Sequence, residues 1–145
     1  MRYFTFVLLF VGLVAFGQTV LPVTDVTKVP NYSYLKTKMD LSEVAVRADV
    51  LPEFPGGINA FRTTLMNKID TFNLNPDNLR KMKTRVYFII EKDGKLTNIL
   101  AMGDIRYSER LEKALKKVKE TWTPAVVNGE PTRFLFTMSL SIEFS

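Results

Sequence analysis

Near its carboxyl end the chain alternates between large apolar side chains and mostly polar ones. The apolar set occupies every second position: Phe134, Phe136, Met138, Leu140, Ile142 and Phe144. A period of two is typical of a β-strand, because successive side chains of a strand point to opposite faces of the sheet. The pattern predicts a long strand, from Thr132 to Phe144, with one face against a core and one face toward water.

A β-hairpin is predicted upstream of this strand. Residues 85–91 alternate in the same way, and Asp93-Gly94 supplies a strong turn signal before the returning strand of residues 96–102. Asp93 is therefore expected to form the turn. Because Tyr87 and Ile89 are apolar as well, we expect part of the second face of the sheet to be covered.

Two amphipathic helices are predicted around the hairpin. The first follows residues 52–57 and carries an apolar stripe: Ile58, Phe61, Leu65 and Ile69. A loop follows from residue 70 to 84, with a helical turn expected over residues 79–82. The second helix is expected to begin at Ser108 as its N-cap, and Trp122 is expected to lie in the core. The predicted class is α+β: a three-stranded antiparallel sheet with two helices packed on one face, in the order helix-strand-strand-helix-strand.

The amino-terminal segment resembles a signal peptide. Arg2 precedes an apolar run, and Ala15 and Gly17 form a small-x-small cleavage site, so we expect residues 1–17 to be removed before Gln18. A retained membrane anchor is the alternative. Residues 18–51 are expected to be a linker with short strands, including one at residues 44–46, and residues 52–145 the folded domain. Export to the periplasm follows from this interpretation, and secretion beyond the outer membrane is left open.

Composition removes several classes of function. The 145 residues contain neither Cys nor His, which excludes disulfides, thiolate nucleophiles and imidazole bases. We expect no metal, no cofactor and no catalytic residue. A hydrolase that used Asp93, Asp104 or Glu109 is a weaker hypothesis, since each carboxylate has a structural reason to be acidic and no nucleophile accompanies them. The net charge of +5 is scattered along the chain and indicates no nucleic acid partner.

Four motifs resemble the C-terminal domain of TonB, in the variant found in exported and envelope proteins of Bacteroidetes-type bacteria. They are the PEFPGG segment at residues 52–57, the hairpin of residues 86–96, the Trp-x-Pro segment at residues 122–124 and the Asn-Gly-x-Pro segment at residues 128–131. The resemblance covers residues 44–144. It implies a three-stranded antiparallel sheet with two helices, in agreement with the pattern of the residues.

The resemblance also implies partners. Family members bind the TonB box of outer-membrane transporters by pairing it with the last strand, so the expected partner is an extended segment of an envelope or outer-membrane protein. Thr137, Ser139 and Ser141 are the candidate partner-binding residues, because small side chains allow close approach. In the alternative interpretation, these small polar residues bind no partner and only keep the exposed face of the sheet in contact with water. Alternatives are a membrane-anchored, TonB-type energy transducer and an envelope scaffold or peptidoglycan-surface protein. An exposed edge is also compatible with strand-exchanged homodimers.

Overall fold

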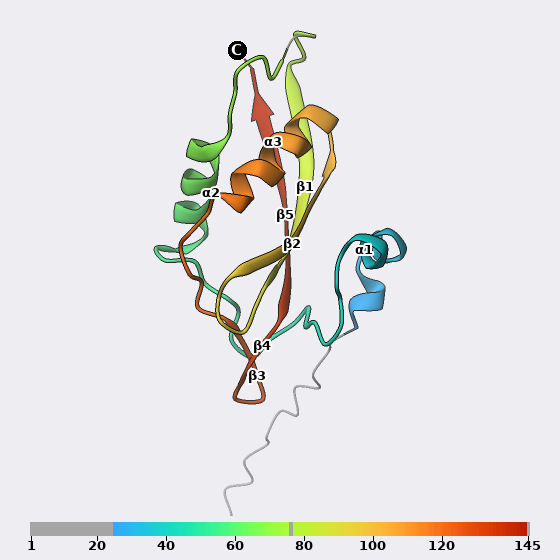
Figure 1. Ribbon diagram of the computed structural model, residues 1–145, viewed down its shortest axis with the longest axis vertical. Helices are drawn as coiled ribbons and strands as arrows, with labels where there is room; N and C mark the ends of the chain where they lie inside the picture. The colour runs from blue at the N-terminus through green and yellow to red at the C-terminus, as the bar shows by residue number, and fades with distance from the viewer. Residues whose placement is uncertain (1–24, 76, 145) are drawn as a thin grey trace, which may run out of the picture.

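The computed structural model describes residues 25–75 and 77–144. Its main feature is a long, twisted antiparallel sheet with the strand order β2-β1-β5 (Figure 1). The elements, in chain order, are η1 (Val26–Lys28), α1 (Tyr32–Lys38), α2 (Gly57–Lys68), β1 (Lys81–Ile90), β2 (Leu96–Gly103), α3 (Ile105–Lys116), β3 (Ala125–Val127), β4 (Glu130–Thr132) and β5 (Phe134–Glu143). The predicted α+β class and the three-stranded sheet are confirmed.

The central strand β1 is longer than the sequence predicts. It pairs with β5 in one unbroken register from Lys81 opposite Glu143 to Ile90 opposite Phe134. The helical turn expected over residues 79–82 is wrong, because Met82 is a buried member of the alternating pattern and extends the strand toward its amino end. Strand β2 returns through the predicted turn, where the Asp93 carboxylate accepts a hydrogen bond from the Lys95 amide at 3.0 Å.

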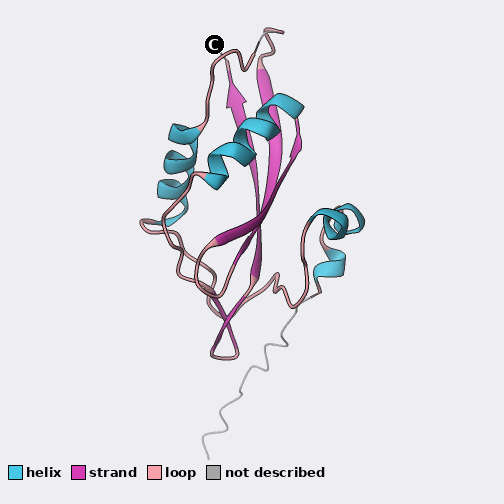
Figure 2. Cartoon of the chain, in the orientation of Figure 1, coloured by secondary structure: helices cyan, strands magenta, loops and turns pink. Residues whose placement is uncertain are grey.

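Helices α2 and α3 lie on one face of the sheet and enclose the main core (Figure 2). Five aromatic rings pack together at its centre: Phe54, Phe61, Phe88, Trp122 and Phe136. The predicted burial of Trp122 is confirmed. Phe61 and Leu65 of α2 and Ile69, which follows the helix directly, are buried as expected, whereas Ile58 is 41% exposed. Ile58 lies in the first turn of the helix, outside the buried cluster.

The amino end of α3 differs from the prediction. The N-cap is Asp104, whose carboxylate accepts a hydrogen bond from the Tyr107 amide at 2.9 Å. An aspartate is as good a cap as a serine, so the N-cap lies four residues before Ser108 and α3 begins at Ile105. Ser108 instead faces the sheet from the first turns of α3, where its buried hydroxyl lies 2.6 Å from that of Thr84 on β1.

The second face of the sheet is covered over one half only. Leu35 of α1, Met39 and Val44 pack against Tyr87, Ile89 and Leu135. This confirms that part of the second face is covered. Where the sequence favoured short strands, however, the chain forms helix α1 and two isolated bridges, a parallel one between Ala45 and Phe134 and an antiparallel one between Val50 and Val126. The apolar side chains of this segment are buried by packing against the sheet. The local sequence does not contain this long-range contact, so it could not predict the conformation of the segment.

The predicted signal peptide, residues 1–17, lies outside the described residues. Among the residues that the structure describes, no helix has the length and apolar character needed to cross a membrane.

Candidate functional site

The outer edge of β5 is the candidate site. Strand β5 pairs with β1 on one side and, as the last strand in the order β2-β1-β5, has no strand along most of its other side within residues 25–75 and 77–144. The predicted partner-binding residues, Thr137, Ser139 and Ser141, all lie on this strand and are exposed. The structure therefore brings the three together at one sheet edge.

Two hydrogen bonds establish which backbone groups of β5 face outward. The Leu135 amide points away from β1 and donates to the Ala45 carbonyl at 2.9 Å. The Phe144 amide points the other way and donates to the carbonyl of Arg80, the residue directly before β1, at 2.9 Å. In an antiparallel pair the direction of the backbone groups alternates from residue to residue. The odd-numbered residues therefore direct their N–H and C=O groups outward, including those of Thr137, Ser139 and Ser141.

The chain itself closes the first part of this edge. Ala45 donates its amide to the Arg133 carbonyl at 2.8 Å and accepts from the Leu135 amide. The Arg133 side chain holds the same segment, because its guanidinium donates to the carbonyls of Asp40 and Ser42. The open edge thus begins after Leu135 and runs to the end of β5.

The opposite edge of the sheet is blocked. On β2, the outward amide of Ala101 donates to a carboxylate oxygen of Glu112, on α3, at 2.9 Å. Farther along β2, the Asn98 side chain accepts from the Asp40 amide at 2.8 Å. A side chain that occupies an outward backbone group, as Glu112 does, hinders edge-to-edge pairing there, and the Asn98 contact brings the Asp40 segment next to β2. Sequence reasoning missed this role of Glu112, because the helical pattern placed it only on a charged, wet face.

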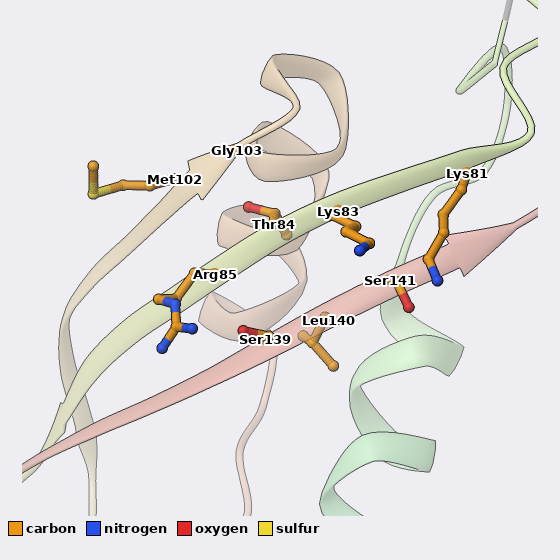
Figure 3. A pocket seen from close by; sticks show the side chains of 9 residues that line it. All are labelled: Lys81, Lys83, Thr84, Arg85, Met102, Gly103, Ser139, Leu140 and Ser141. Carbon is orange, nitrogen blue, oxygen red and sulfur yellow. The ribbon is translucent and has the colours of Figure 1, made fainter. Parts of the chain in front are cut away.

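Two hollows flank the open edge, one on each face of β5. The hollow on the uncovered half of the second face has a volume of about 470 Å³. Its lining includes Lys81, Lys83 and Arg85 from β1 together with Ser139 and Ser141 from β5 (Figure 3). The other hollow, of about 310 Å³, lies between β5 and α2, where it is lined by Arg62 and Met66. An added strand would therefore have space for side chains on both of its faces.

The charges of the first hollow are only partly compensated. Lys81 forms an ion pair with Glu143 at 2.9 Å, and this hydrogen bond lowers the pKa of the Glu143 carboxyl below its usual value. Lys83 and Arg85 are exposed, and no ion pair involves either of them within the described part of the chain. The open half of this face is therefore positively charged.

The carboxylates of the hydrolase hypothesis do not meet at this site. Asp93 shapes the hairpin turn, Asp104 caps α3, and Glu109 is an exposed residue of that helix. Across residues 25–75 and 77–144, no cluster of three Asp, Glu, His or Cys side chains could hold a metal ion.

Comparisons with protein-family models, with curated proteins and with solved structures find no match to this chain.

Proposed function

We propose that this protein is an exported, periplasmic binding module of the TonB C-terminal type. It would recruit an envelope or outer-membrane protein by pairing an extended segment of that partner with the outer edge of β5. Backbone hydrogen bonds would supply affinity, and the flanking hollows would select side chains. The TonB-like motifs of residues 52–57, 86–96, 122–124 and 128–131 favour this interpretation.

One observation carries the proposal: the backbone groups of Thr137, Ser139 and Ser141 face outward along an edge that no strand of residues 25–75 and 77–144 occupies. The contrast between the two edges supports it. Glu112 occupies the outward amide of Ala101 on β2, and Asn98 of β2 binds the Asp40 amide through its side chain, whereas the small residues of β5 leave room for a close backbone. Natural sheets commonly protect their edges. A sheet in which one edge is protected and the other is left open is therefore suited to pair with a partner at the open edge.

Amide hydrogen exchange tests the proposal. The probes are synthetic peptides that copy the periplasmic N-terminal segments of outer-membrane proteins encoded in the same genome. Strand addition should slow the exchange of the amides of Thr137, Ser139 and Ser141, while the β2 amides stay unchanged. If every such peptide leaves these three amides unprotected, or protects β2 instead, the proposal is wrong.

A further inference from the structure

The charges beside the open edge indicate what kind of segment binds there. We infer that the strand that pairs with β5 is acidic, with carboxylate side chains at two alternating positions that face Lys83 and Arg85. This inference rests on the proposed function and names the chemical class of the partner segment. Three observations support it: the register between β1 and β5, the absence of ion-pair partners for Lys83 and Arg85 in the described part of the chain, and the small size of the side chains of β5.

The register places each free cation beside a serine. Arg85 lies opposite Ser139, and Lys83 lies opposite Ser141. Directly opposite residues project from the same face of a sheet. Figure 3 shows the side chains of Lys83 and Arg85 extending from β1 toward β5, where the short serine side chains leave space above the strand.

The distances suit a carboxylate on the added strand. A strand paired with β5 lies two strand spacings from β1, which is about 10 Å. The long stem of Lys83 or Arg85 and the side chain of a glutamate together span this separation, because only the small hydroxyl of Ser139 or Ser141 stands between them. Those hydroxyls would also donate to the same carboxylate.

Charge complementarity is restricted to these two positions. Lys81 is already neutralised by Glu143, at 2.9 Å. Thr137 lies opposite Tyr87, which is buried beneath the α1 segment, so a partner side chain beside Thr137 would meet no cation of β1. The expected pattern is therefore two acidic residues separated by one residue, with a neutral or apolar residue at the position on the same face that lies beside Thr137.

Matched peptides and matched variants test the inference. Three β-prone peptides of alternating Thr and Val differ only at two positions, which carry Glu, Gln or Lys, and their dissociation constants are measured by fluorescence anisotropy with the full-length chain. The Glu peptide should bind about tenfold more tightly than the Gln peptide, and the Lys peptide more weakly than either. Added salt should reduce the difference between the Glu and Gln peptides, since both cations are exposed.

A double variant localises the effect. In Lys83→Gln/Arg85→Gln, the Glu and Gln peptides should bind equally, with the affinity for the Gln peptide retained. The control, Lys116→Gln/Lys117→Gln, removes the same charge at the exposed end of α3 and the residue after it, on the opposite face of the sheet, and should keep the preference for Glu. Equal losses in both variants would show a net-charge effect and overturn the inference.

The outcomes separate the inference from the proposed function. If the Glu and Gln peptides bind the unaltered chain equally and both protect the β5 amides, the inference is wrong and strand addition stands. If no peptide protects these amides, the proposed function itself fails. Vesicles of phosphatidylglycerol test a lipid surface as the alternative ligand. If the vesicles bind through Lys83 and Arg85 while the Glu peptide does not bind, the two cations contact lipid and the inference is overturned.

Discussion

Arg133 and Glu91 form an ion pair in which both side chains are mostly shielded from solvent, with 14% and 23% of their surfaces exposed. The Nε and Nη2 atoms of Arg133 donate to the two carboxylate oxygens of Glu91, at 2.8 and 3.1 Å. The same guanidinium donates to the Asp40 and Ser42 carbonyls. One side chain thus joins the end of β1, the start of β5 and the segment that closes the first part of the open edge.

Replacing Arg133 should weaken both the fold and this closure. We expect Arg133→Ala to lower the free energy of unfolding by about 2 kcal/mol, because shielded hydrogen bonds to charged groups are lost and Glu91 stays without its partner. The amide of Leu135 should exchange faster as Ala45 detaches. Urea unfolding and amide exchange measure the two effects. Lys81→Ala, which breaks an exposed pair, should change stability little, and equal effects of the two variants would contradict the prediction.

The same pair predicts a pH dependence. Hydrogen bonds from Arg133 lower the pKa of Glu91 below the usual 4.5, outweighing the opposing effect of burial. Because the pKa is depressed in the folded state, the stabilisation is complete above about pH 4.5 and is lost as the pH falls through the folded value.

Glu91→Gln isolates this effect from the other carboxylates. The variant should be less stable than the unaltered chain near neutral pH, and the difference should narrow as the pH falls below 4.5. Urea unfolding across the acid range measures it. A difference that stays constant with pH would show that Glu91 contributes through packing and not through its charge.

The parts of the fold that rest on long periodic patterns could be predicted. The alternation of β5 and the spacing of Phe61 and Leu65 in α2 specify which face is buried, because each pattern repeats over ten or more residues. Helix α1 could not be predicted in the same way. It has seven residues and one fully buried side chain, Leu35, so its position depends on Tyr87 and Ile89, about fifty residues away in sequence.

The candidate site, too, could be predicted in the part that depends on a local pattern and not in the part that depends on contacts between elements. Thr137, Ser139 and Ser141 could be predicted, because their exposure follows from the alternation of a single strand. Lys83 and Arg85 could not, since their relation to β5 depends on the register between two strands, which no local pattern contains. The blocking of β2 by Glu112 likewise depends on a contact between two elements.

The buried hydroxyl pair of Thr84 and Ser108 should behave as a unit. Ser108→Ala leaves the Thr84 hydroxyl without its partner inside the core, which should cost about 1–3 kcal/mol. Thr84→Val/Ser108→Ala removes both hydroxyls and should be closer in stability to the unaltered chain than Ser108→Ala is. A double-mutant cycle by urea unfolding measures the coupling. Strictly additive effects would mean that the 2.6 Å contact contributes nothing to stability.

Proline at two neighbouring positions of β5 separates binding from folding. The Ser139 amide faces outward, so Ser139→Pro removes a donor for the partner and no hydrogen bond to β1, and edge strands tolerate such a proline. We expect a folded variant that binds partner peptides at least about tenfold more weakly. Leu140→Pro, whose amide faces Thr84 on β1, should unfold the sheet. Circular dichroism and peptide anisotropy measure both, and undiminished binding by folded Ser139→Pro would contradict strand addition at this edge.

Two glycines with nearly the same positive φ provide a final, steric test. Gly94 and Gly129 have φ values of +81° and +78°, but a Cβ atom at Gly94 would lie 1.9 Å from the Trp122 carbonyl oxygen, whereas one at Gly129 meets nothing within 4 Å. Gly129→Ala should therefore cost only the strain of a positive φ, about 1 kcal/mol. Gly94→Ala adds a clash with backbone and displaces Trp122, whose amide donates to the Gly94 carbonyl, so it should cost about 3 kcal/mol or more.

Trp122 is the single tryptophan of the chain, so its fluorescence reports the displacement directly during thermal unfolding. Equal losses of stability in the two variants would show that the turn can move away from Trp122 and that the close approach is not required by the fold.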